Sequence, residues 1–162
     1  MNEIRQEHEE GSHEMRLDLP AAHSAGRMAR QMLRQFAVKE ALPEVEVETL
    51  EFVAGELLDN AVDHGGGEAT MEASDLQGDI RMSLNLKIES NSWIVRVDDQ
   101  GGGNAKEMQE VINPTDELPD LEDERGRGFF LITQMVDDLR VVDSADGKGL
   151  GFVATRNYGA DS

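Results

Sequence analysis

The sequence predicts an α+β fold, a two-layer sandwich in which helices cover one face of a mostly antiparallel sheet. Two early stretches carry apolar residues at helical spacing, and several later stretches alternate apolar and polar residues with a period of two. Short turns join the alternating stretches, as they do in antiparallel hairpins. These patterns place helices and strands in one layer each. With 162 residues, the chain suits one domain with a single core.

The N-terminal region is predicted to contain a tail and a short strand. Residues 1–14 are polar and acidic, so we expect a flexible tail there and a single domain over 15–162. Residues 15–19 alternate apolar and polar side chains, as a short edge strand does. Pro20 ends this strand because proline lacks the backbone donor that continued pairing needs.

Two helices are predicted next. Over residues 22–40, apolar side chains recur every three or four positions. A second helix begins at Pro43 and runs to about His64, and the glutamates in its first turns suit the positive end of the helix dipole. One side of this helix is apolar and is expected to face the core. The apolar stripe consists of Leu50, Val53, Ala54, Leu57 and Ala61.

The remaining elements are predicted from alternation and turns. Strands over 82–88 and 93–97 share a short turn, and a later hairpin pairs 139–143 with 150–156. A third helix is expected to open at residue 126 with a Gly-Arg-Gly sequence. The polar stretch between the strand over 93–97 and this helix is about twenty residues long, which is long for a loop. We therefore expect it to contain a helix fragment and a mobile lid.

The charge narrows the choice of partners. The net charge is −19, and a surface this negative repels nucleic acid and anionic membranes. We therefore expect neither as a partner. The charge suits a solvated surface, and it would also attract a basic protein surface. The polar, acidic N-terminus does not resemble a secretory signal, and there is no cysteine for disulfides or thiolate metal sites. The absence of cysteine leaves the redox compartment open, and the absence of a secretory signal favours a cytoplasmic location.

The second helix carries a polar stripe opposite its apolar one. Glu56 and Asn60 are four residues apart and share one face, and Asp63 lies near the same stripe. An asparagine oxygen is a ligand that Mg²⁺ can use beside water and phosphate oxygens. A glutamate in this position could take a proton from a nucleophile. The same stripe also suits a solvated face of an amphipathic helix.

Two glycine-rich segments follow. Asp99 and three glycines come directly after a strand, where a carboxylate can accept a hydrogen bond from an amino group such as that of adenine. Glycines let the backbone pass close to a flat ring or a phosphate, although they equally suit a turn. Gly126-Arg127-Gly128 precedes a helix, and the free N–H groups at a helix start bind phosphate. A flexible loop end would also explain these last glycines.

Taken in order, these segments resemble a known ATPase superfamily. Glu56–His64, Asp99–Gly103 and Gly126–Ile132 are similar to its N box, first glycine box and second glycine box. The superfamily includes gyrase-type ATPases, sensor histidine kinases and anti-sigma-factor serine kinases, and its fold is the Bergerat α/β sandwich. The resemblance covers Met15–Tyr158, nearly the whole chain. Within the superfamily, the stand-alone anti-sigma-factor serine kinases look most similar.

The resemblance implies ATP and Mg as cofactors and a set of site residues. Glu56 would be the catalytic base, Asn60 the Mg ligand and Asp99 the residue that binds adenine. The superfamily often has a Gly-Thr pair before its last strand, whereas this chain has Leu150 in place of the threonine and lacks that hydroxyl. The remaining nucleotide-binding positions implied by the resemblance are Asp63, Gly101, Gly103, Arg125, Gly126, Arg127 and Gly128.

By the same resemblance, residues 15–162 form an ATP-binding kinase domain. The implied function is an ATP-dependent serine/threonine kinase that regulates a sigma factor and phosphorylates a small antagonist (anti-anti-sigma type) protein, commonly as a homodimer. Two alternatives are a non-catalytic ATP-responsive binding module and a stand-alone catalytic domain of histidine-kinase type.

Overall fold

A computed structural model describes residues 3–9, 12–65, 80–112 and 124–158 of the chain. Four helices and six strands lie within these ranges, and after residue 20 the predicted elements lie within a few residues of the observed ones. In chain order they are β1 (Glu3–Glu9), β2 (Ser12–Pro20), α1 (His23–Lys39), α2 (Glu44–Gly65), β3 (Arg81–Glu89), β4 (Ser92–Asp98), α3 (Ala105–Ile112), α4 (Glu124–Met135), β5 (Asp138–Asp143) and β6 (Leu150–Asn157).

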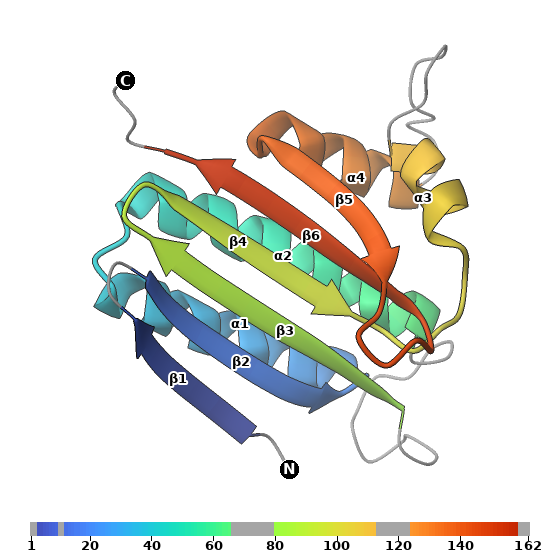
Figure 1. The fold of residues 1–162 in the computed structure, drawn as a ribbon, viewed down its shortest axis with the longest axis horizontal. Coiled ribbons are helices and arrows are strands. Elements are labelled where there is room, and N and C mark those ends of the chain that lie inside the picture. Colours follow the sequence, from blue (N-terminus) through green and yellow to red (C-terminus); the bar gives the residue numbers. More distant parts are fainter. Residues whose placement is uncertain (1–2, 10–11, 66–79, 113–123, 159–162) are drawn as a thin grey trace.

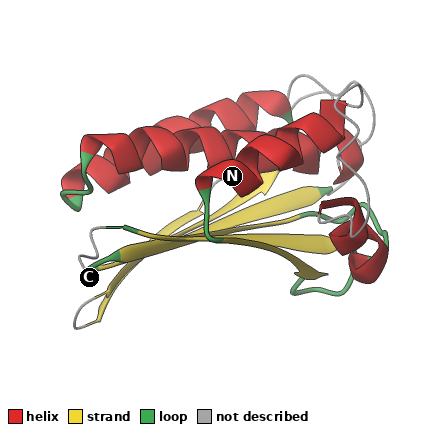
Figure 2. Ribbon diagram, turned by 90° about the horizontal axis from the view of Figure 1, so that it is seen from above, coloured by secondary structure: helices red, strands yellow, loops and turns green. Residues whose placement is uncertain are grey.

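The six strands form one sheet in the order β1-β2-β3-β4-β6-β5. Each neighbouring pair is antiparallel. In Figure 1 the long helices α1 and α2 run behind the sheet, and Figure 2 shows the long helices stacked on one face of it. The predicted two-layer α+β sandwich is therefore confirmed.

The core lies between the helices and one face of the sheet. The predicted apolar stripe of α2 is fully buried there, since each of its members is at most 1% exposed. Alternate residues of the strands meet this stripe, and their neighbours face the other, open side of the sheet. Among the described residues, no helix combines the length and the apolar character that crossing a membrane requires. The strand residues in this core include Met15, Leu17, Leu19, Met82, Leu84, Leu86, Trp93, Val95 and Val97.

The N-terminal region differs from its prediction. Glu3–Glu9 is strand β1, paired antiparallel with β2, and β2 begins at Ser12 rather than at residue 15. The prediction of a tail over 1–14 is therefore wrong for these residues. The physical reason is that β1 is joined to the sheet through its backbone, while Ile4 is its single apolar residue. Such a segment gives no apolar alternation to detect.

Helix α3 confirms the helix fragment expected after β4. The side-chain oxygen of Asn104 accepts a hydrogen bond of 2.9 Å from the Glu107 N–H, which caps the start of the helix. Gln109 holds α3 against β5, because its amide nitrogen donates to the Leu139 carbonyl at 3.2 Å and its oxygen accepts from the Val141 N–H at 2.8 Å. The lid expected after α3 falls on residues 113–123, which lie outside the described residues.

A charge cluster joins the helix layer to the sheet where β4 begins and β6 ends. Glu46, in the first turn of α2, is 5% exposed and accepts hydrogen bonds from Arg156 Nε at 2.6 Å and Arg156 Nη2 at 2.9 Å. It also accepts one from the indole N–H of Trp93 at 2.9 Å. Arg156 in turn donates to the Met135 carbonyl at the end of α4. Burial raises the pKa of Glu46, but the hydrogen bonds from Arg156 and Trp93 prevail and lower it below 4.5.

Candidate functional site

Asp99 lies directly after β4 and is held by backbone donors. It is 4% exposed, and its Oδ1 accepts hydrogen bonds from the Gly101 N–H at 3.0 Å and the Leu150 N–H at 3.2 Å. The Asp99 N–H donates to the Leu150 carbonyl at 2.9 Å, which continues the pairing of β4 with β6. The carboxylate therefore has a fixed orientation at the end of the sheet, as recognition of an amino group requires.

Two glycines make room for this arrangement. A Cβ atom at Gly149 would lie 2.4 Å from the backbone oxygen of Asp99 and 2.5 Å from its Oδ1, which is closer than atoms can approach. Gly103 has a φ of +106°, and a Cβ atom there would lie 3.1 Å from Leu150 Cδ1. Leu150, which stands where the superfamily often has threonine, thus packs against the glycine loop as an apolar wall.

The contact between Gly149 and Asp99 gives a first testable prediction. Gly149→Ala is expected to lower the free energy of unfolding by about 3 kcal/mol, the upper end of the usual cost of overpacking, because the added methyl group would clash with the Asp99 backbone. Gly147→Ala is the matched control, since Gly147 lies in the same loop with a φ of +75° and has nothing within 4 Å of its Cβ position. Its cost is the backbone strain alone, about 1 kcal/mol. Urea denaturation measures both; equal losses would contradict the overpacking.

Glu56 of α2 meets Gly128 in the second turn of α4, which begins at Glu124 rather than at the predicted residue 126. A Cβ atom at Gly128 would lie 2.8 Å from Glu56 Oε1, so the glycine lets the carboxylate rest against the α4 backbone. The next residue, Phe129, is 3% exposed and stacks on Phe152 of β6 with ring centroids 5.5 Å apart. The start of α4 is thereby fixed against both α2 and the sheet, and the structure brings the predicted N box and second glycine box together.

Asn60 and Asp63 follow Glu56 along α2 but have different surroundings. Asn60 is half-buried one turn after Glu56, and its amide nitrogen is fully buried. Asp63 is 61% exposed and its Oδ1 lies 3.1 Å from His23 Nε2, while Asp59 lies 3.4 Å from the other ring nitrogen. Asp63 is therefore engaged by the first residue of α1, a contact that the helical spacing of α2 alone does not reveal.

The predicted basic residues lie in the first turns of α4. Arg127 is exposed at the surface of the helix. The Arg125 side chain lies outside the described residues, and for Gly126 the structure gives the helical backbone alone. Gly101 is exposed beside Asp99. The site residues thus fall into two groups, one around Asp99 at the end of β4 and one around Glu56 where α2 meets α4.

A magnesium ion would fit this site only with ligands from outside the protein. Among the described residues, no group of three or more His, Asp or Glu side chains could hold a metal ion. Mg²⁺ commonly takes one or two protein oxygens and completes its coordination with water and substrate phosphates. The Asn60 amide beside Glu56 fits that pattern, since it offers one neutral oxygen. The residues present are therefore compatible with Mg held between the protein and a nucleotide.

Several residues that the sequence analysis missed support the Asp99 group. Gln100 donates to Asp146 at 2.9 Å and accepts from the Arg81 N–H at 2.9 Å. Asp146 also accepts from the Ser144 hydroxyl at 2.8 Å and the Lys148 N–H at 2.9 Å. Led by the hydrogen bond from Gln100, these contacts lower the pKa of Asp146 to about 2. The Ser-Ala-Asp-Gly turn sequence was the available signal, because such residues bond to their own backbone.

Comparisons with known proteins identify the family and the fold. The family described as Histidine kinase-like ATPase domain matches residues 19–153. Among solved structures, a chain of the SiaB–SiaC complex from Pseudomonas aeruginosa is 15% identical, with a TM-score of 0.60, and the match covers 87% of this chain and 88% of that chain. At this identity, the structural likeness shows the shared fold. A comparison with curated proteins finds no match.

Proposed function

This chain belongs to the Histidine kinase-like ATPase domain family, and from that premise we propose that it is an ATP-dependent protein serine/threonine kinase. Membership of an ATPase family implies ATP binding, and the finer activity is our proposal. The observation that carries it is the contact of the Glu56 carboxylate with Gly128, the fifth residue of α4. It sets a proton acceptor about one turn from the N-terminus of a helix, where free N–H groups favour phosphate.

Each group of site residues has a proposed role. Asp99 accepts a hydrogen bond from the adenine amino group, with Gly101 and Gly103 giving the ring and phosphates close access to the backbone. Arg125, Gly126 and Arg127 bind phosphates at the start of α4. Asp63 lies near the same stripe of α2 as Glu56 and Asn60, and we propose that it contributes to nucleotide binding. Positioning and charge stabilisation then supply most of the catalysis.

At the reacting end, Glu56 accepts the proton of the serine or threonine hydroxyl as that oxygen attacks the terminal phosphorus, the bond from this phosphorus to the bridging oxygen breaks, and ADP leaves. The Asn60 side-chain oxygen would hold Mg. When bound, Mg neutralises part of the phosphate charge. The strongly acidic surface makes this local supply of dipoles and cations necessary, because a nucleotide triphosphate is itself an anion.

The proposed partner is a small antagonist protein of anti-anti-sigma type, with a sigma factor as the regulated target. The SiaB–SiaC structure holds a chain of this fold in a complex with a second protein, which supports protein partners for this chain. We also propose that the chain acts in the cytoplasm and forms a homodimer, as such kinases commonly do. Sedimentation equilibrium of the purified chain tests the dimer, and a monomer at micromolar concentration would contradict it.

The activity is tested by a phosphotransfer assay. The protein is incubated with Mg and γ-labelled ATP in a lysate of its own source, beside an Asn60→Ala variant. We expect acid-stable label on a small second protein, and at least a ten-fold loss of label with the variant, because removal of one electrostatic partner of the phosphates costs about that much or more. Purification of the labelled protein would identify the substrate.

Other outcomes of the same assay favour the alternatives. Acid-labile label would indicate phosphohistidine and a catalytic domain of histidine-kinase type. ATP binding without any transfer would indicate an ATP-responsive binding module. Absence of ATP binding by calorimetric titration in the presence of Mg would contradict all three.

A further inference from the structure

Two consecutive aspartates at the end of β4 point to opposite faces of the sheet. Asp99 belongs to the site described above, whereas Asp98 faces the open side and is 8% exposed. Asp98 forms a two-pronged ion pair with Arg96 of the same strand, with Nε–Oδ1 at 2.6 Å and Nη2–Oδ2 at 3.1 Å. Because successive residues share one backbone, displacement of Asp98 also displaces Asp99.

The Arg96–Asp98 pair also holds the loop between β5 and β6. Asp98 Oδ2 accepts a hydrogen bond of 2.8 Å from the Ala145 N–H, and Arg96 Nη2 donates to the Asp143 carbonyl at 3.2 Å. The loop ends at Leu150, whose N–H donates to Asp99. The loop is thus fixed from the open face by the pair and from the opposite face by Asp99.

The sequence of β6 leaves space for this pair. Gly151 is the cross-strand partner of Asp98, and a Cβ atom there would lie 2.7 Å from Asp98 Oδ1 and 3.0 Å from Arg96 Nη2. Gly149 makes the corresponding space for Asp99 on the other face. The Gly-Leu-Gly segment therefore fits between the carboxylates of Asp98 and Asp99. Movement of either carboxylate would change how the Leu150 backbone packs against the other.

From these contacts we propose that Arg96 and Asp98 are positioning residues that determine the selectivity of the nucleotide site for adenine. The inference rests on the proposed role of Asp99 in adenine binding. An orientated carboxylate accepts the adenine amino group, but it opposes the carbonyl oxygen that guanine carries at the same position. Loosening of the pair releases the Leu150 N–H from its fixed place, and Asp99 then loses the orientation on which this discrimination depends.

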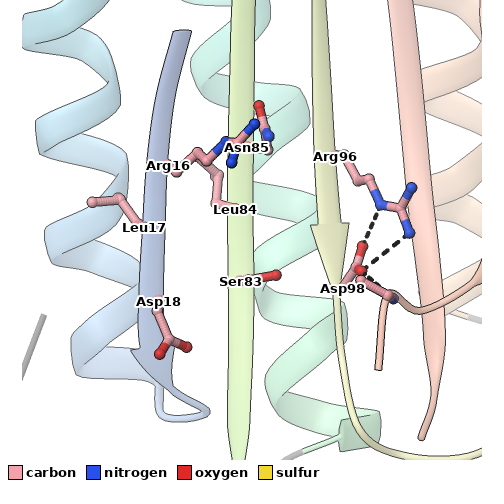
Figure 3. Close-up of a pocket in the computed structure, with 9 residues that line it drawn as sticks. Arg16, Leu17, Asp18, Ser83, Leu84, Asn85, Arg96 and Asp98 are labelled. Carbon is pink, nitrogen blue, oxygen red and sulfur yellow. Dashed lines mark hydrogen bonds and ion pairs between the residues drawn. The ribbon is translucent and has the colours of Figure 1, made fainter. Parts of the chain in front are cut away.

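The pair is accessible for experiment without a change in the core. Arg96 and Asp98 line a cavity of about 460 Å³ on the open face, together with Arg16 and Asn85 of the neighbouring strands (Figure 3). The open face also offers a matched control. Arg140 pairs with Asp138, again two residues apart on one strand, at 3.4 Å, and its side chain is 66% exposed.

The test compares ATP and GTP affinities of the full chain by calorimetric titration. We expect Arg96→Gln and Asp98→Asn to weaken ATP binding about ten-fold and GTP binding by less than about two-fold, an effect typical of residues that couple to a site without touching the ligand. Arg96→Lys keeps the charge but loses the fork, so it should show an intermediate loss. Arg140→Gln should leave both affinities within about two-fold.

The outcomes separate this inference from the proposed function. If the wild-type chain binds ATP in preference to GTP and Arg96→Lys and Asp98→Asn keep that ratio, the positioning role is overturned while ATP binding stands. A lower melting temperature with an unchanged ratio would likewise overturn it and leave a structural role. If the wild-type chain binds neither nucleotide, the proposed function itself fails. Arg96→Lys decides the matter where Arg96→Gln does not fold.

Discussion

Glu56→Gln is expected to lower the rate of phosphotransfer by about 10²- to 10⁴-fold, the usual contribution of a positioned general base. Glutamine keeps the shape of the side chain beside Gly128 but cannot take a proton at neutral pH. ATP affinity should stay within about two-fold, because the proposed adenine contact belongs to Asp99 at the end of β4. Single-turnover transfer to the labelled acceptor protein and a separate ATP titration measure the two quantities.

Glu51→Gln is the matched control, because it makes the same substitution at another glutamate of helix α2. Glu51 pairs with Arg34 at 2.7 Å on the outer side of α2, so transfer should be unchanged within about two-fold. Full activity of Glu56→Gln would remove Glu56 from the role of base. A parallel loss of ATP affinity would instead assign it to nucleotide or metal binding.

The second large effect is on stability. Glu46→Ala is expected to lower the free energy of unfolding by about 3 kcal/mol, since it leaves the partly buried Arg156 charge uncompensated and the buried Trp93 N–H without its acceptor. Glu46 is 5% exposed and holds both Arg156 and Trp93, so its loss disturbs α2, β4 and β6 together. Guanidinium denaturation at pH 7 measures the change.

Glu48→Ala provides the control, because Glu48 is exposed two residues further along the same helix; its effect should stay within about 0.5 kcal/mol. The difference between wild type and Glu46→Ala should also depend on pH. The pKa of Glu46 is lowered in the folded state from its ordinary value of 4.5. Its charge therefore stabilises the protein fully above about pH 4.5, and this contribution is lost as the pH falls through the folded-state pKa. A difference that is constant from pH 7 to pH 3 would contradict the ionic contribution.

Most of the fold could be predicted from the sequence because its core is regularly patterned. The alternation over residues 82–88 and the stripe of α2 correspond directly to buried faces. Strand β1 could not be predicted in this way, because backbone pairing with β2 places it in the sheet and Ile4 gives no periodic signal. Strand β1 was predicted as a tail because a strand without alternating apolar residues gives no periodic signal in the sequence.

The candidate site was predictable as a set of motifs but not as a geometry. The order of the three boxes indicates which residues gather, and the structure brings Glu56 to Gly128 and fixes Asp99 at the end of its strand. The support for Asp99 could not be predicted, because it depends on the register that sets Asp98 opposite Gly151. Such a register joins segments far apart in the chain and has no local sequence signature.

The small contact between Gln109 and β5 has a consequence for assembly. A strand at the border of a sheet exposes a row of backbone donors and acceptors, on which another chain can be templated. Here the amide of Gln109 occupies the outward carbonyl of Leu139 and the outward N–H of Val141, as an added strand would. Intermolecular β-augmentation at β5 must first displace α3, so one border of the sheet is protected against aggregation by a single side chain.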